Sequence, residues 1–134
     1  MVLTLSNALL TGESSVESEN GTLTVGNRTM HYDRAGKCVE VIDANTIQVY
    51  GVGRVQLTQV GIDSEADSAK KFVEEKCLSK IVYLDVDDKK PTDKYGRTLA
   101  VVYTDTDDIN RELIDSGMAK ISYFTPSEFK KGEV

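Results

Sequence analysis

The chain has little of what metal-thiolate sites and membrane spans require. Its 134 residues include one His, two Cys and two Pro. Neither Cys38 nor Cys77 has a second Cys or a His at zinc-binding spacing, and His31 has no partner at ligand spacing, so we assign it no role. No apolar run reaches the roughly 20 residues of a spanning helix. The sequence therefore predicts neither a zinc site nor a membrane span.

Positive charge is also scarce. The chain has 16 Lys and Arg against 22 Asp and Glu, a net charge of −6. Tight, non-specific binding of nucleic acid draws most of its affinity from Lys and Arg on phosphates. This acidic balance disfavours such binding, although nine basic side chains could still gather on one local face: Lys70, Lys71, Lys76, Lys89, Lys90, Lys94, Arg97, Lys130 and Lys131.

The composition divides the chain into two unequal parts. Residues 1–35 include a polar, acidic stretch at 12–21 without periodicity, which predicts a mobile segment with one short strand at 22–25. Residues 36–134 are of ordinary globular composition and predict one domain. Two N-x-T sequons, at Asn20 and Asn27, indicate an exported or cell-surface protein, but the apolar first ten residues lack the basic start of a signal peptide.

The pattern from residue 36 onward predicts a mainly β fold. Apolar alternation and turn residues predict strands at 37–43, 46–50, 54–62, 81–86 and 97–103. A capping signature at 64–67 starts a helix that runs to about Leu78. Asp107 or Asp108 caps a second helix, Gly117 ends it, and a short extended segment follows at 118–123. A helix between the third and fourth of five strands is the order of an OB-fold barrel.

Three motifs carry a family resemblance. Residues 41–47, Val-Ile-Asp-Ala-Asn-Thr-Ile, and residues 60–64, Val-Gly-Ile-Asp-Ser, are followed by Thr-Asp-Lys-Tyr-Gly-Arg-Thr-Leu-Ala at 92–100. The chain resembles the staphylococcal nuclease, or thermonuclease-like, family, whose members share a D-K-Y-G-R-x-L-A signature. The resemblance implies a phosphodiester hydrolase in which calcium is held by two aspartates and a backbone carbonyl. It also implies a glutamate that acts on the attacking water and two arginines that clamp the phosphate.

Carried over residue by residue, the resemblance assigns candidate roles. Arg97 stands at the position of one phosphate-clamping arginine, and Lys94, Tyr95, Arg97 and Tyr123 stand where the family lines its nucleotide pocket. Asp63, Asn45 and Asp43 stand at the metal site, so the resemblance implies at most a weak calcium site there. The expected ligand aspartate is replaced by Asn45.

Two further replacements fall on the catalytic groups. Thr58 stands where the other arginine is expected, and Ala66 where the glutamate is expected. Glu65 or Asp67 flanks the missing glutamate and is a candidate substitute base. Groups that act as a unit can each abolish most of the rate when lost. We therefore expect a largely dismantled nuclease site in a weak or inactive enzyme.

Three functions from different classes stay open on the sequence. We favour a non-catalytic module that binds single-stranded nucleic acid or a nucleotide, or a module that binds a protein partner, in either case as a monomer. The alternative is a calcium-dependent nuclease with a rearranged active site.

Several of these residues also have plain structural interpretations. Arg97 could pair with a carboxylate of its own loop, Asp85, Asp87, Asp88 or Asp93. Asp63 could cap the first helix, and Tyr95 and Tyr123 could be packing residues at the barrel edge. Cys38 and Cys77 could form a disulfide or remain two buried thiols.

Overall fold

The computed structural model describes residues 21–62 and 64–134. The elements in chain order are β1 (Gly21–Val25), β2 (Arg28–Tyr32), β3 (Arg34–Asp43), β4 (Thr46–Val49), β5 (Gly53–Leu57), β6 (Val60–Gly61), α1 (Ala66–Cys77), β7 (Ile81–Val86), β8 (Thr98–Tyr103), α2 (Ile109–Asp115) and β9 (Lys120–Ile121). No helix in this described part is long and apolar enough to cross a membrane.

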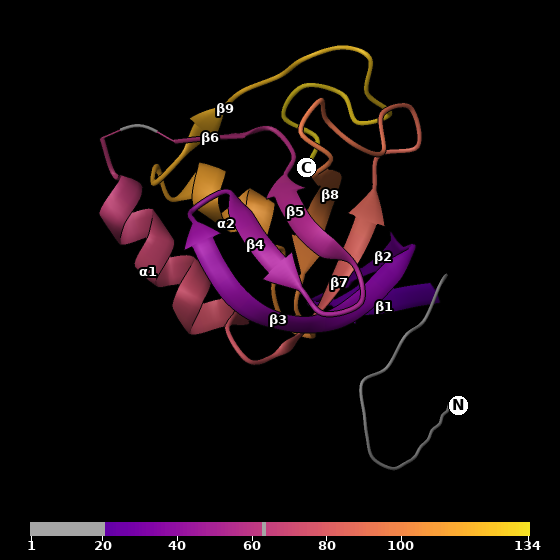
Figure 1. Ribbon diagram of the computed structural model, residues 1–134, viewed down its shortest axis with the longest axis horizontal. Helices are drawn as coiled ribbons and strands as arrows, with labels where there is room; N and C mark the ends of the chain where they lie inside the picture. The colour runs from indigo at the N-terminus through magenta and orange to yellow at the C-terminus, as the bar shows by residue number, and fades with distance from the viewer. Residues whose placement is uncertain (1–20, 63) are drawn as a thin grey trace.

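Five of the strands close into a barrel in the order β3-β4-β5-β8-β7 (Figure 1). All neighbours are antiparallel except β5 and β8, which pair in parallel. The ten-residue β3 shows register shifts between Cys38 and Glu40 and between Val41 and Asp43. Such irregularities bend a strand, and β3 pairs with β7 through its first half and with β4 through its second. The predicted OB-type barrel, with one helix between its third and fourth strands and a second helix after its fifth, is confirmed.

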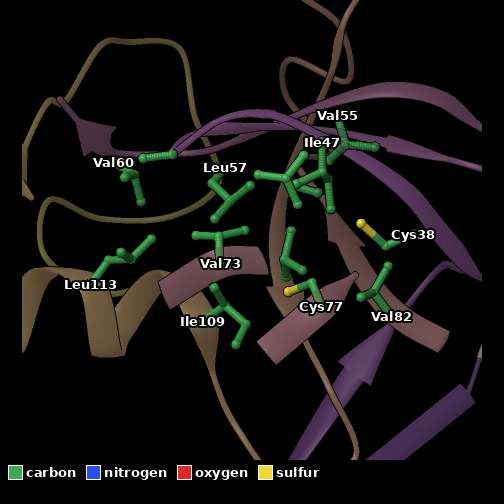
Figure 2. Packing of buried hydrophobic residues seen from close by; sticks show 14 of the residues in the cluster. Cys38, Ile47, Val55, Leu57, Val60, Val73, Cys77, Val82, Ile109 and Leu113 are labelled. Carbon is green, nitrogen blue, oxygen red and sulfur yellow. The ribbon is translucent and has the colours of Figure 1, made fainter. Parts of the chain in front are cut away.

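The core fills the barrel and the space beneath the two helices. Apolar side chains of alternating strand positions point inward (Figure 2), among them Ile47, Val55 and Leu57, all fully buried. From α1, the side chains of Val73 and Cys77 complete this cluster, at helical spacing. Burying one Val or Leu side chain stabilises the fold by about 1.5–3 kcal/mol, so the barrel holds its surface loops on a rigid base.

The two cysteines are free thiols in this core. Burial raises the pKa of Cys38 to about 11 and that of Cys77 to about 12. A thiolate is the reactive form of cysteine, so both thiols are chemically inert packing groups at neutral pH.

One predicted strand is wrong in its extent. The strand expected at 54–62 ends at Leu57 and resumes as β6, because Gln59 adopts a positive φ of 65°. The buried Gln59 side chain explains the break, since its amide donates to the Lys130 carbonyl and accepts from the Gly132 N–H. The chain therefore turns here to meet the C-terminal segment, and β6 pairs with β9.

The strand predicted at 22–25 is β1, and it forms a hairpin with β2 that the sequence did not indicate. Leu23, Val25 and Met30 pack against a second, smaller cluster that includes Phe129. Tyr32 meets Tyr83 of β7 edge to face, with 5.0 Å between ring centroids. Asn27 lies in the exposed turn of the hairpin, whereas Asn20 lies outside the described residues. The division of the chain at residue 35 stays a prediction.

Candidate functional site

A cleft of about 530 Å³ opens at one end of the barrel. Its lining residues come from three regions: the end of β5 with the start of β6, the loop between β7 and β8 with the first part of β8, and the C-terminal segment after β9. The traces of these regions approach one another in the upper part of Figure 1. The lining residues are Gln56, Thr58, Gln59, Val60, Asp87, Lys90, Asp93, Lys94, Tyr95, Arg97, Leu99, Ser122, Phe124, Pro126 and Ser127. Barrel residues thus form the floor of the cleft, and two connecting segments form its walls.

The first wall is a tight turn organised by Asp93. One carboxylate oxygen of Asp93 accepts hydrogen bonds from the backbone N–H groups of Tyr95 and Arg97, at 2.9 and 3.0 Å. The other oxygen accepts from Arg97 Nε at 2.7 Å. Gly96 supplies the positive φ of 80° that the turn requires. Although burial opposes the effect, these hydrogen bonds from Arg97 and Tyr95 lower the pKa of Asp93.

The pairing of Arg97 with a carboxylate of its own loop is therefore observed, and Asp93 is the partner. The contact uses Nε alone. Among the described residues, the two terminal guanidinium nitrogens of Arg97 have no hydrogen-bond partner. One edge of the guanidinium is fixed to the turn, and its other donors remain for an anion in the cleft.

Two aromatic side chains stand exposed at the rim of the cleft. Tyr95 is 72% exposed and Phe124 is 76% exposed, the two largest values among the large apolar side chains of the described part. The Lys94 ammonium and the Arg97 guanidinium lie 5.2 and 5.4 Å from the centre of the Tyr95 ring, within cation–π range. The rim thus offers flat apolar faces and positive charge side by side.

The second wall is fastened by the buried carboxylate of Asp87, which is 1% exposed. Ser127 donates its hydroxyl proton to this carboxylate, and the backbone N–H groups of Glu128, Lys89 and Lys90 donate as well. Asp87 therefore joins the β7–β8 loop to the C-terminal segment and fixes the width of the cleft between them.

The floor of the cleft includes Thr58, whose backbone is tightly held. The Thr58 N–H donates to the Ala100 carbonyl at 2.9 Å, and the fully buried Asn110 amide donates to the Thr58 carbonyl at 2.8 Å. The Asn110 oxygen accepts from the Val102 N–H at 2.9 Å. One amide of α2 thus ties β8 to the end of β5 and sets the position of Thr58.

Of the three predicted metal ligands, Asp63 lies outside the described residues, whereas Asp43 and Asn45 are described. Asp43 is exposed and accepts a long hydrogen bond, 3.4 Å, from the Asn45 N–H. The Asn45 amide nitrogen donates to the Val60 carbonyl at 3.1 Å, and its oxygen accepts from the Thr46 hydroxyl. Calcium takes six to eight oxygen ligands. Asp43 and Asn45 together supply one carboxylate and one amide oxygen, and the amide oxygen already accepts a hydrogen bond from Thr46. This pair is a poor fit to calcium.

The predicted substitute bases do not line the cleft. Glu65 is the N-cap residue of α1, and Asp67 lies in the first turn of this helix. Both residues are exposed. Ala66, at the position of the expected glutamate, is half-buried. Tyr123 is half-buried and is not a lining residue either, whereas its neighbours Ser122 and Phe124 are. Of the predicted nucleotide pocket, the cleft brings together Lys94, Tyr95 and Arg97.

Comparison with known proteins identifies the lineage. The family model of staphylococcal nuclease homologues matches residues 54–133, more than half of the chain. The chain belongs to the staphylococcal nuclease family. It is 27% identical over 123 residues to a thermonuclease of Staphylococcus hyicus, covering 82% of this chain and 72% of that protein. It is 30% identical over 103 residues to a thermonuclease of Staphylococcus intermedius, covering 66% of this chain and 60% of that protein.

The part matched to the nuclease family contains the whole cleft, from Gln56 to Ser127. The family model itself begins at residue 54, after Asp43, Asn45 and the β1–β2 hairpin, whereas the match to the Staphylococcus hyicus thermonuclease covers 82% of the chain. The resemblance inferred from the three motifs is thus confirmed at the level of the family.

Sequence reasoning missed three contributors to the cleft of this nuclease-family domain. Phe124 lies just beyond the extended segment predicted at 118–123, and no motif marks it. Asp87 is expected only as a possible partner of Arg97, since a sequence cannot show that Ser127 and Glu128 return to it. Gln59 falls inside the strand predicted at 54–62, and its polar side chain gives no signal of a turn.

Proposed function

We propose that this chain is a non-catalytic member of the staphylococcal nuclease family that binds single-stranded nucleic acid or its nucleotides in the cleft. One observation carries the proposal. The cleft rim joins two exposed aromatic side chains, Tyr95 and Phe124, to the cationic groups of Lys90, Lys94 and Arg97. This combination suits a ligand with flat bases and a charged backbone.

Base stacking and the local charge of the cleft both favour binding of a nucleic-acid strand through a small number of contacts. Stacking of a base on an aromatic side chain contributes about 1–3 kcal/mol and tolerates any base sequence. The cleft carries three cationic residues against two carboxylates, Asp87 and Asp93, and both carboxylates already accept hydrogen bonds from the protein. The local balance of the cleft is therefore positive in a chain whose net charge is −6.

The same cleft lacks groups that hydrolysis would require. Thr58, which lines the cleft together with Arg97, offers a neutral hydroxyl where the family resemblance places a second arginine. Transition-state charge on a phosphoryl group needs several preorganised cations. Ala66 supplies no base, and Asn45 uses its amide within the protein. These replacements support binding without turnover.

Family membership favours one alternative, a calcium-dependent nuclease with a rearranged site. In that case Glu65 or Asp67 would act on the attacking water, and Arg97 would hold the phosphate. Cleavage that requires calcium and disappears in Arg97→Ala would establish this alternative.

Binding is tested by fluorescence anisotropy with labelled single-stranded DNA and RNA oligonucleotides, in chelator to prevent cleavage. We expect Tyr95→Ala and Phe124→Ala each to weaken binding by about fivefold or more. Tyr50→Ala is the matched control, since Tyr50 is 62% exposed and lies outside the cleft. Raising the salt concentration should weaken binding by the wild type. Equal affinities for the Tyr95→Ala and Tyr50→Ala variants would refute the proposed cleft.

A further inference from the structure

Away from the cleft, three potential metal ligands meet between the hairpin and the barrel. They are His31 on β2, Asp33 just after it, and Asp85 on β7, and one ligand atom from each lies within 4.8 Å of the other two. His31 Nε2 and Asp33 Oδ1 are 3.0 Å apart. We propose that His31, Asp33 and Asp85 bind a divalent transition-metal ion of the zinc class and thereby join the β1–β2 hairpin to the barrel.

The backbone holds these ligands in place before any ion binds. The Asp33 N–H donates to the Leu84 carbonyl at 2.7 Å, and the Val86 N–H donates to Asp33 Oδ2 at 2.7 Å. These two contacts lie on either side of Asp85 along β7. They leave Asp33 Oδ1 directed to His31, so that one carboxylate oxygen is anchored and the other serves as ligand. Partners of this kind orient the ligands in metal sites.

The third ligand, Asp85, has a carboxylate without a hydrogen-bond partner. This carboxylate is half-buried, and none of the described residues donates to it. Unpaired, partly buried carboxylates are costly. The charged groups that face this carboxylate, apart from His31, are themselves acidic, namely Glu128, Asp33 and Asp88.

The donor set selects the class of ion. One imidazole nitrogen with two carboxylate oxygens suits zinc or a similar first-row ion, whereas calcium takes oxygen ligands. Metal–ligand bonds of about 2.0–2.2 Å place tetrahedral ligand atoms roughly 3.3 Å apart. The His31–Asp33 distance of 3.0 Å is close to this value, and the Asp85 ligand atom lies within 4.8 Å of both. Water would take the fourth position.

This inference revises the expectation that His31 has no role and that the chain has no zinc site. Ligand spacing along the sequence does not reveal Asp85. The pairing of β3 with β7, in which Arg34 lies opposite Leu84, brings Asp85 close to Asp33 and His31. His31 and Asp33 precede residue 54, where the match to the family model begins, and none of His31, Asp33 and Asp85 lines the cleft. The site is therefore separate from the cleft, and this proposal does not rest on the proposed function.

The single histidine of the chain makes the test specific. Zn²⁺ is titrated into the full chain while the ring resonances of His31 are followed by NMR. We expect a saturable shift with one Zn²⁺ bound per chain. The affinity for Zn²⁺ should fall at least about tenfold in Asp85→Asn, because even the loss of a residue that only supports a metal ligand costs about that much. Asp115→Asn, which changes an exposed carboxylate on α2 outside the cluster, should bind Zn²⁺ as the wild type does.

Absence of a shift up to about 1 mM Zn²⁺, or equal affinities for the wild type and Asp85→Asn, would overturn the proposal. A second variant keeps the test decisive should Asp85→Asn fail to fold. His31 is exposed, so His31→Ala should fold. Zn²⁺ should raise the Tm of the wild type and leave that of His31→Ala unchanged. An equal rise in both, or no rise in the wild type, would contradict the site.

Discussion

The turn and the floor of the cleft differ in what their side chains do for the fold. In the turn at 93–97, the Asp93 carboxylate, the conformation of Gly96 and the Arg97 Nε all maintain the local structure. On the floor, Thr58 is held only through its backbone N–H and carbonyl. A change at Asp93 or Gly96 therefore disturbs the turn, whereas a change in the side chain of residue 58 removes no hydrogen bond of the described structure.

This difference separates family membership from activity. The D-K-Y-G-R signature is recognisable because its residues build a turn, whether or not a phosphate is cleaved beside it. At the three positions where the family resemblance predicts catalytic or metal-binding groups, this chain has Asn45, Thr58 and Ala66, and the barrel forms with these residues in place. A signature of this kind is therefore evidence of ancestry first and of chemistry second.

The largest effect should come from restoring the residues that the family resemblance predicts at positions 45, 58 and 66. The triple variant Asn45→Asp, Thr58→Arg, Ala66→Glu should gain calcium-dependent cleavage of single-stranded DNA, by at least about 10³-fold over the wild type, because a second phosphate clamp and a base return together. Release of acid-soluble nucleotides measures it. The same triple with Gln in place of Arg at residue 58 is the control. Equal rates for the two triples would mean that a cation at residue 58 is not what the floor lacks.

The next largest effect concerns the bond that positions the floor. Asn110→Ala should lower the free energy of unfolding by about 3 kcal/mol, since it leaves the buried Thr58 carbonyl and Val102 N–H without their partner. Urea denaturation measures the loss. Asn27→Ala, in the exposed hairpin turn, should change stability by less than about 0.5 kcal/mol. A similarly small change in Asn110→Ala would show that the floor does not depend on α2.

A smaller effect is expected in the turn. Asp93→Ala should cost about 2 kcal/mol, because it removes two backbone acceptor contacts and the partner of Arg97. It should also weaken oligonucleotide binding, as Tyr95 and Arg97 lose their fixed positions. Asp115→Ala removes an exposed carboxylate 3.8 Å from Arg111 and should be close to neutral. If both variants denature at the same urea concentration as the wild type, the turn is not organised by Asp93.

The smallest effect is a pH dependence in the scaffold. Burial, followed by a hydrogen bond to Asp107, raises the pKa of Glu112 from 4.5 to about 7. The folded state then binds more protons than the unfolded state between those values, so this contribution to stability is present below about pH 4.5 and is lost as the pH rises through 7. The free energy of unfolding of Glu112→Gln minus that of the wild type should therefore be larger at about pH 8 than at about pH 5. An identical difference at both pH values would contradict the shift.

Local patterns predicted the fold well. The predicted strand at 81–86 is β7, Asp108 caps α2 by accepting from the Arg111 N–H, and the five barrel strands come in the expected order. These features depend on neighbours in sequence. The hairpin, the break at Gln59 and the pairing of β6 with β9 depend on contacts across the whole chain, such as that between Gln59 and Lys130. Periodicity alone does not contain them.

The candidate site was predictable only where a continuous motif encodes it. Lys94, Tyr95 and Arg97 come from one turn and line the same cleft, and their role in nucleotide binding stays a prediction. Phe124 and Asp87 come from segments that the fold brings together, and the triad of His31, Asp33 and Asp85 requires the pairing of β3 with β7. The roles of Glu65, Asp67, Asp63 and Tyr123 stay predictions.

The central claim is binding without hydrolysis, and one assay measures both. Labelled single-stranded DNA is incubated with the wild type and with Arg97→Ala, in millimolar calcium and in chelator, and bound and cleaved fractions are determined in the same samples. We expect the wild type to bind in both conditions, more tightly than Arg97→Ala, and to cleave no faster than that variant. Calcium-dependent cleavage by the wild type that is lost in Arg97→Ala would contradict the account and establish a working nuclease.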